Sequence, residues 1–258
     1  MMRELRAFGS GVMFLTRIPV PRAVGHSDAQ LAASTAYFPV VGALVGAIGG
    51  VVLLLAARWW TPFIAATAAV ATTIWVTGAF HEDAWADACD GFGGGWDTEQ
   101  VLTIMKDSRV GAYGAIGVAL MLAARIAAVS ALVGRDPWTA ARVLLAAHVL
   151  ARWSSLPLIR ALPYLSTQGN SKPVAAGVTI PRLAVGTALA ALLSLSVLAP
   201  LGARVVGIAW GVGGVTTIVG ARYLRRRIGG ITGDALGAVN QATEVAICLA
   251  MAMRGVIA

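Results

Sequence analysis

Long segments without a charged residue dominate this chain. Residues 38–57, 59–80 and 183–203 are uncharged throughout, and each is long enough to cross a bilayer, which takes about 20 apolar residues. Four weaker candidates, residues 110–134, 137–151, 205–221 and 235–253, are slightly short or contain an ionisable residue. By length, these segments predict an all-α fold, a polytopic integral membrane helical bundle of about six to eight transmembrane or re-entrant helices.

The composition excludes an ordinary soluble domain. Of the 258 residues, 58% are hydrophobic and 12% are charged, and mean hydropathy is +0.77, as in polytopic membrane proteins. Residues 1–258 are therefore expected to form a single integral membrane domain that contacts lipid and no nucleic acid. Arg3, Arg6 and Arg17 surround short apolar stretches, which favours an interfacial amphipathic helix over a cleavable signal. Cys89 and Cys248 stand in no metal-binding spacing.

The positions of Lys and Arg predict which helix ends face the cytosol, because cytoplasmic loops are enriched in these residues. Successive crossings place fourteen of them on the side of an acidic segment, residues 81–110, and four on the other, with Arg125 and Arg142 inside the membrane. The acidic segment and the glycine-rich residues 229–237 are therefore expected to face the cytosol. The fourteen are Arg3, Arg6, Arg17, Arg22, Lys106, Arg109, Arg152, Arg160, Lys172, Arg182, Arg222, Arg225, Arg226 and Arg227; the four are Arg58, Arg135, Arg204 and Arg254.

Seven of the twelve acidic residues fall within residues 82–107, directly after an uncharged segment. Clustered carboxylates repel one another unless a cation lies among them, and Mg²⁺ takes oxygen ligands and usually carries substrate phosphates. The cluster therefore predicts metal-dependent phosphate chemistry at the membrane surface. Its members are Glu82, Asp83, Asp87, Asp90, Asp97, Glu99 and Asp107.

Three of these acids have helical spacing. Asp83, Asp87 and Asp90 stand at i, i+4 and i+7, so a helix places their carboxylates on one face, where they could hold the metal ion. Glu82 and His81 lie at the edge of that face, as a further ligand or proton acceptor. The alternative is a solvated helix end whose acids face water. The cost of acids near hydrocarbon favours the metal site.

Glycines follow the acids. The run from Gly91 to Gly95 is predicted to end the helix and to let backbone amides approach a phosphate, although a flexible turn is an equal alternative. Asp97, three residues before Gln100, is predicted to cap a short surface helix. Capping and the helix dipole also account for Glu99.

Lys106, Asp107, Ser108 and Arg109 follow that short helix. Two cations and a hydroxyl beside an acid suit a diphosphate clamp, and a basic anchor at the membrane edge is the alternative.

Other polar and small residues receive structural interpretations. The glycines at 42, 46 and 50 and at 111, 114 and 117 are expected to form small-residue helix contacts. Charges within a membrane need partners, so Arg125, Arg142, His148 and Glu244 are expected to form structural pairs.

The acidic and basic motifs also resemble those of a known family. Residues 80–91 read Phe-His-Glu-Asp-x-x-x-Asp-x-x-Asp-Gly and residues 105–114 read Met-Lys-Asp-Ser-Arg-Val-Gly-x-x-Gly; both closely resemble the hallmark of the adenosylcobinamide-GDP ribazoletransferases, the membrane cobalamin synthases. Residues 15–21, 38–42 and 232–238 resemble the family's other segments in the expected order, so the resemblance covers essentially the whole chain. The family often has Leu-His-x-Asp, and a non-glycine residue after Gly91-Phe92, which puts only the role of Glu82 in question.

The resemblance implies the last assembly step of coenzyme B12, in the bacterial cytoplasmic (inner) membrane. α-Ribazole, or its 5′-phosphate, displaces GMP from adenosylcobinamide-GDP. Mg²⁺ held by Asp83, Asp87 and Asp90 would bridge the diphosphate, Lys106 and Arg109 would offset charge on GMP, and His81 or a carboxylate would accept the ribazole proton. The expected catalytic residues are His81, Glu82, Asp83, Asp87, Asp90, Lys106, Asp107 and Arg109, and Gly91, Ser108, Gly233 and Asp234 are expected to contact substrate or cofactor.

Two other classes stay open at this point. A CDP-alcohol phosphotransferase also combines a helical bundle with spaced aspartates, but Asp90-Gly91 lacks the Ala-Arg and the distal Gly-x-x-x-Asp-x-x-x-Asp that follow in that family. A cation transporter would need its acids near the membrane midplane, whereas these lie at a helix end.

Overall fold

The computed structural model describes residues 2–25, 27–165, 174 and 177–257. Within them, the regular secondary structure is helical apart from one isolated bridge between Tyr164 and Ile231. Five helices are long and apolar enough to cross a membrane, or six if the bent pair α4 and α5 forms one span. The prediction of an all-α polytopic bundle is confirmed. The long helices are α3 (Phe38–Ala56), α4 (Pro62–Thr77), α7 (Ala112–Val133), α8 (Pro137–Ala161), α10 (Ile180–Leu198), α11 (Ala203–Arg227) and α12 (Gly233–Ala252).

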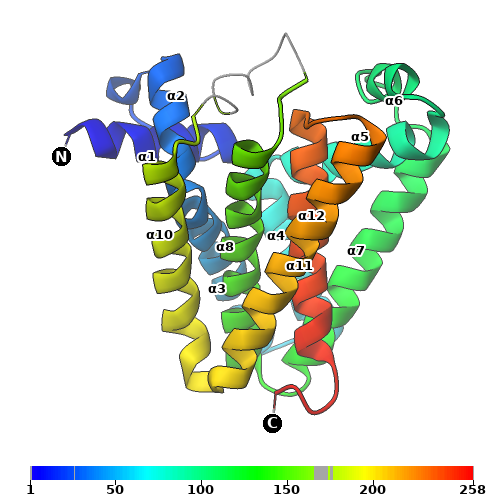
Figure 1. Ribbon diagram of the computed structural model, residues 1–258. Helices are drawn as coiled ribbons and strands as arrows, with labels where there is room; N and C mark the ends of the chain where they lie inside the picture. The colour runs from blue at the N-terminus through cyan, green and yellow to red at the C-terminus, as the bar shows by residue number, and fades with distance from the viewer. Residues whose placement is uncertain (1, 26, 166–173, 175–176, 258) are drawn as a thin grey trace.

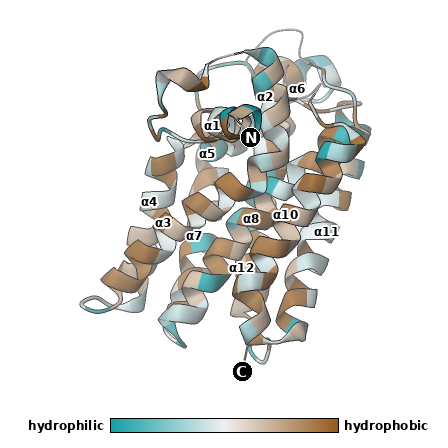
Figure 2. Ribbon diagram, turned by 90° about the vertical axis from the view of Figure 1, so that its left-hand side faces the viewer, coloured by the Kyte–Doolittle hydropathy of each residue, from teal (hydrophilic) through white to brown (hydrophobic). Residues whose placement is uncertain are grey.

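The shorter elements gather at one end of the bundle, hereafter the acidic end (Figure 1). They are α1 (Met2–Leu15), η1 (Arg22–Val24), α2 (Asp28–Ser34), η2 (Thr35–Tyr37), α5 (Phe80–Gly94) and α6 (Thr98–Ile104); η3 (Ala199–Leu201) lies at the opposite end. α1 lies across the long helices, as an interfacial helix would, and the two termini lie at opposite ends. Figure 2 shows hydrophobic residues along the long helices and most hydrophilic ones near the two ends.

Glycines allow the long helices to approach one another closely. In α3, a Cβ added at Gly46 would lie 2.7 Å from the Cα of Leu145, and one at Gly50 would lie 3.5 Å from the Cβ of Ala141, both in α8. Without a hydrophobic driving force between helices in lipid, such close contact supplies much of the attraction. The small-residue contact predicted for the glycines of α3 is therefore confirmed.

The buried apolar residues form two clusters, separated by a layer of charge. Along α8, Leu144 and Leu150 belong to the cluster nearer the opposite end, and Leu156 and Ile159 to the cluster at the acidic end. The charged layer lies at the level of His148 and Arg152, where α8 contacts α12. This layer explains why α8, which runs the length of the bundle, is not among the helices apolar enough to qualify as spans.

The distribution of basic residues needs one correction. The sequence predicts Arg152 on the same side of the membrane as the acidic segment, but it lies inside the bundle with only 2% of its surface exposed. Lys172 lies outside the described residues. Twelve of the fourteen basic residues therefore remain at the acidic end, against four at the other, so the asymmetry persists.

Candidate active site

A sharp bend between α4 and α5 turns the acidic segment across the end of the bundle. The two helices meet at 89°, and the turn consists of Gly78 (φ 67°) and Ala79 (φ 60°), both left-handed. Such a φ is natural for glycine and strained for alanine. The backbone N–H of Arg17 donates to the Val76 carbonyl (2.8 Å), and a side chain at Gly78 would collide with the Arg17 guanidinium. The bend thus holds α5, with its acids, at the acidic end.

Carboxylates from two helices crowd together beside this bend. Asp83 and Asp87 are both on α5, where Asp83 is exposed and Asp87 is half-buried. Asp234 lies in the first turn of α12. This helix packs closely against α5 at the contact between Gly237 and Ala84. Burial raises the pKa of Asp87 to about 7, and the negative charges of Asp83, Asp234 and Asp90 add to the effect. In the described part of the chain, Asp83, Asp87 and Asp234 form no ion pair with a basic residue. Their repulsion is therefore uncompensated by the protein.

The oxygen chemistry of this cluster suits a hard divalent cation. Among the described residues, no group of three or more His, Cys, Asp or Glu is arranged to hold a metal ion by itself. Mg²⁺ commonly requires only one or two carboxylates, with waters and substrate phosphates completing its shell. Asp83, Asp87 and Asp234 therefore fit a cation that is shared with a phosphate ligand. The ligand set predicted from the sequence, which consists of Asp83, Asp87 and Asp90, stays a prediction.

Asp90 makes hydrogen bonds to another helix that its spacing along α5 does not predict. It is 8% exposed, and its carboxylate accepts the backbone N–H groups of Gly111 (2.7 Å) and Gly114 (2.8 Å) at the start of α7. These N–H groups are among the four that a helix start leaves without an intrahelical partner. Any side chain at Gly111 or Gly114 would collide with the Asp90 carboxylate. Asp90 therefore fastens α7 to α5, and the predicted glycine contact at this helix start is confirmed.

Glu82, unlike Asp90, is not among the acids around Asp87. It is 7% exposed, and its Oε1 accepts from Arg125 (3.2 Å) and from Gln241 (3.0 Å). This places Glu82 in a buried ion-pair cluster, and not among the carboxylates that raise the pKa of Asp87.

The buried ion-pair cluster joins four helices. Glu244 of α12 pairs with Arg125 of α7 and, at 2.7 Å, with Arg152 of α8. Nδ1 of His148 lies 3.0 Å from the Glu244 carboxylate. With Glu82 of α5 the cluster holds two carboxylates and two guanidinium groups, so its charges balance when His148 is neutral. The structural role predicted for Arg125, His148 and Glu244 is confirmed. Arg142 lies outside the cluster and is partly exposed.

The glycine run after the acids is helical up to Gly94, and Gly95 is extended. α5 therefore ends within the run from Gly91 to Gly95, as predicted. A Cβ at Gly91 would lie 2.5 Å from the Met105 side chain, and one at Gly93 would lie 2.6 Å from the Tyr113 ring. These glycines let the segments around α6 and the start of α7 pack onto α5. Asp97 caps α6 as predicted, accepting from the Gln100 N–H at 2.9 Å.

The basic segment lies at the surface between α6 and α7. Lys106, Ser108 and Arg109 are exposed. The Arg109 guanidinium pairs with Asp107 at 2.6 Å, and this pairing lowers the pKa of Asp107 to about 2. Arg109 is thus tied to its neighbour, two residues away, and the clamp role stays a prediction.

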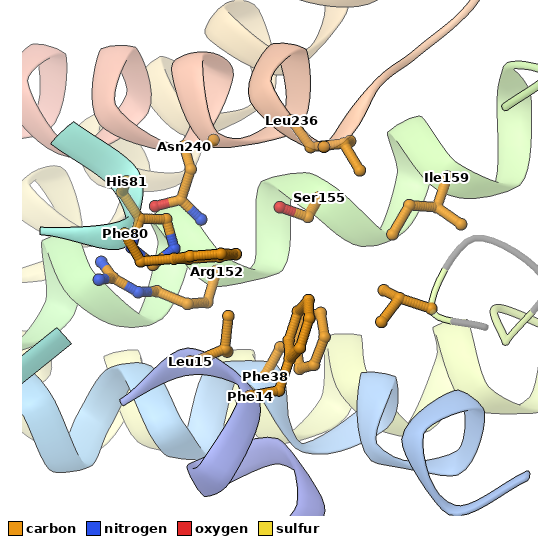
Figure 3. Close-up of a pocket in the computed structure, with 13 residues that line it drawn as sticks. Phe14, Leu15, Phe38, Phe80, His81, Arg152, Ser155, Ile159, Leu236 and Asn240 are labelled. Atoms are coloured by element: carbon orange, nitrogen blue, oxygen red, sulfur yellow. The ribbon is translucent and has the colours of Figure 1, made fainter. Parts of the chain in front are cut away.

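His81 and Gly233 line a pocket at the acidic end, between α1, α3, α5, α8 and α12 (Figure 3). The same pocket includes Arg152, Ser155 and Asn240, which the sequence interpretation did not single out. Arg152 stands four residues after His148 and Asn240 four before Glu244, so each shares a helix face with a member of the buried cluster. This spacing of four residues was the sequence signal from which Arg152 and Asn240 could have been identified.

The chain is similar to known proteins over nearly its whole length. Residues 7–252 match the family described as cobalamin-5-phosphate synthase. A protein of Leptothrix cholodnii named adenosylcobinamide-GDP ribazoletransferase is 40% identical over 253 residues, covering 96% of each chain. Proteins with the same name from Ralstonia nicotianae (94% of this chain and 93% of the relative) and Shewanella pealeana (98% and 97%) are each 38% identical. No solved structure matches the chain.

Proposed function

The chain belongs to the cobalamin-5-phosphate synthase family, and from that premise we propose that it joins α-ribazole or its 5′-phosphate to adenosylcobinamide-GDP, with release of GMP. A ribose hydroxyl of the ribazole forms a bond to the phosphorus that carries the cobinamide. The bond from that phosphorus to GMP breaks, and the hydroxyl proton passes to a basic group of the protein. The product is adenosylcobalamin or its 5′-phosphate.

One observation carries the assignment of the site. Asp83, Asp87 and Asp234 crowd together at the acidic end without a basic partner among the described residues. Such a site would repel a diphosphate unless a cation is shared between the acids and the ligand. Bound Mg²⁺ would neutralise charge on the diphosphate as it is cleaved.

The remaining residues bind, orient and accept a proton. The Nδ1 atom of His81 has no hydrogen-bond partner in the described structure, and a free imidazole nitrogen can accept the hydroxyl proton. Lys106 and Ser108 are exposed beside the acidic end and can bind the leaving phosphate of GMP. Arg109 can join them if it exchanges Asp107 for phosphate, which accepts the same bidentate fork.

The acidic end is assigned to the cytosolic side of the bacterial inner membrane. The twelve-to-four distribution of basic residues supports this orientation, and exposed aromatic residues near both ends of the bundle, including Trp96 and Trp59, are typical of the two membrane interfaces.

Reconstitution tests the proposal directly. Purified full-length protein in nanodiscs is supplied with adenosylcobinamide-GDP and α-ribazole, with Mg²⁺ or with EDTA, and GMP and corrinoid product are quantified by chromatography. Stoichiometric GMP and adenosylcobalamin only with Mg²⁺ are expected. Equal turnover in EDTA would contradict the metal role alone, and absence of product with folded protein would contradict the transferase.

A further inference from the structure

A groove between α5, α11 and α12 is lined almost entirely by apolar atoms. Its volume is about 250 Å³, whereas a single water needs only about 10–15 Å³. Of the described side chains that line it, only those of Trp85, Cys89 and Tyr223 carry a polar atom. Water fills an apolar space poorly, because each water needs two or more polar partners. The groove therefore suits an apolar occupant that is much larger than a water.

The open side of the groove faces the bilayer. Tyr223, which lines the groove, is 45% exposed, and Val219, four residues earlier on the same face of α11, is 57% exposed. Val215, a further four residues back, is 60% exposed. Exposed apolar residues on a membrane helix contact lipid chains, which are as apolar as these side chains. A lipid chain can therefore reach the groove from the side.

Close contacts between the walls keep the groove from collapsing. A Cβ added at Gly220 would lie 2.8 Å from the Val239 side chain, so α11 and α12 already touch beside the groove. Phe92 of α5 meets Tyr223 of α11 edge to face, with ring centroids 5.0 Å apart. The walls cannot move together to fill the space, so the occupant has to come from outside the chain.

Positive charge without a carboxylate partner lies at the acidic end of this groove. α11 ends in Arg225, Arg226 and Arg227, and within the described residues none of the three takes part in an ion pair. The Arg227 guanidinium donates to the carbonyls of Phe92 (3.4 Å) and Gly95 (3.1 Å), and Phe92 lines the groove. Carbonyl groups carry no net charge, so the charge of Arg227 stays available to an anion.

We infer that the groove binds an anionic phospholipid, with an acyl chain between α5, α11 and α12 and the phosphate at Arg226 and Arg227. Arg226 is exposed and stands three residues after Tyr223, so it shares the open side of the groove. Basic pockets between membrane helices are typical sites for anionic head groups. A phospholipid supplies both the phosphate and the adjoining apolar chain, whereas a nucleotide or free phosphate would leave the groove empty.

The spacing along α11 fits such a lipid. The α11 residues that line the groove stand three to seven positions before Arg227, which is about 4–10 Å along the helix axis. Trp96 is 89% exposed and directly follows Gly95, whose carbonyl Arg227 contacts. Exposed tryptophans gather at the head-group level of a bilayer. A phosphate at Arg226 and Arg227 would lie at that level, and its acyl chain would begin beside the groove.

Head-group selectivity provides the first test. Native mass spectrometry of the full-length protein, released from detergent micelles, measures the Kd of the first bound lipid for phosphatidylglycerol and for phosphatidylcholine with the same acyl chains. Wild type should bind phosphatidylglycerol at least about fivefold more tightly. Arg226→Gln should remove most of this preference, and Arg226→Lys, which keeps the charge, should retain it. Arg204→Gln, at the opposite end of α11, is the control and should change either Kd by less than about twofold.

Filling the groove provides the second test. Ala242→Leu places a larger side chain in the groove, while Ala119→Leu adds the same side chain at an exposed position of α7 outside it. Ala242→Leu should raise the Kd of both lipids about fivefold or more, because the acyl chain loses its place. Ala119→Leu should leave both within about twofold. If Ala242→Leu melts below wild type, the Arg226 variants decide alone.

Several results would overturn the inference. They are equal Kd values for the two lipids in wild type, equal effects of Arg226→Gln and Arg204→Gln, and unchanged lipid binding in a stable Ala242→Leu variant. Competition by glycerophosphoglycerol, which has the head group without acyl chains, would indicate a site for free phosphate. A dimer mass that Ala242→Leu abolishes would assign the groove to a second copy of the chain. The measurements contain no substrate, so failure of the transferase would leave them unchanged.

Discussion

Asp90 and Asp87, three residues apart on α5, should respond in opposite ways to the same substitution. The Asp90 carboxylate accepts two backbone N–H bonds, at 2.7 and 2.8 Å, in a buried position. Asp90→Asn keeps one acceptor and turns an NH₂ group toward the other N–H. Losing a charge-assisted bond costs about 1.5–3 kcal/mol, and a buried unpaired N–H adds to this. We expect a total loss of about 2–4 kcal/mol.

Asp87→Asn is the matched control. Asp87 is half-buried among like charges that raise its pKa to about 7. Removing its charge relieves repulsion, so the metal-free protein should be unchanged or more stable by up to about 1 kcal/mol, after allowance for solvent screening. Turnover should nevertheless be lost, because the proposed cation site loses a charged ligand.

Thermal unfolding of the detergent-solubilised protein, followed by circular dichroism with and without Mg²⁺, separates the two residues. Asp90→Asn should melt roughly 4 °C or more below wild type. Wild type should gain about 2.7 kcal/mol at Mg²⁺ one hundred times above its Kd, and Asp87→Asn should gain almost nothing. Wild-type stability in Asp90→Asn would refute its fastening role, and near-normal turnover by Asp87→Asn at saturating Mg²⁺ would remove Asp87 from the site.

Three further predictions concern the buried cluster, the basic segment and the topology. Glu244→Gln should destabilise the protein by about 3–5 kcal/mol in denaturant titration, because it leaves two buried guanidinium groups facing one carboxylate; a loss below about 1 kcal/mol would contradict the charge balance. Arg109→Lys should lower kcat and kcat/KM together, by about 2–4 kcal/mol of transition-state stabilisation, if the guanidinium binds the leaving phosphate, whereas unchanged kinetics would leave Lys106 as the nearby candidate. In a background without native cysteines, Trp96→Cys should react with an impermeant maleimide only from the cytosolic side and Arg204→Cys only from the other; the reverse pattern would invert the topology.

Local sequence signals predicted the helices well. The uncharged segment 38–57 became α3 (Phe38–Ala56), and the Asp97 cap appeared at the start of α6. The cap depends on interactions within a few residues, and the apolar helix depends on contact with the lipid bilayer. Local sequence therefore specifies both without reference to the rest of the fold. The glycine run ends α5 as predicted, but only at Gly94, and the helical Gly91 and Gly93 leave room for the side chains of Met105 and Tyr113.

The sequence by itself determined that the chain has helices suited to span a membrane and that acidic residues gather at one end, where phosphate chemistry stays a prediction. Hydrophobicity, charge and helical spacing are carried by neighbouring residues. Only the tertiary structure decided the neighbours of each charge. Asp83 and Asp87 lie near Asp234, which is about 150 residues further along the chain. Asp90 holds the start of α7, and Glu82 pairs with Arg125 in the interior. Residues of equal charge on one helix had indistinguishable roles until neighbouring helices supplied donors to some and none to others. The partner of a polar group is a long-range contact, which spacing along one helix cannot specify.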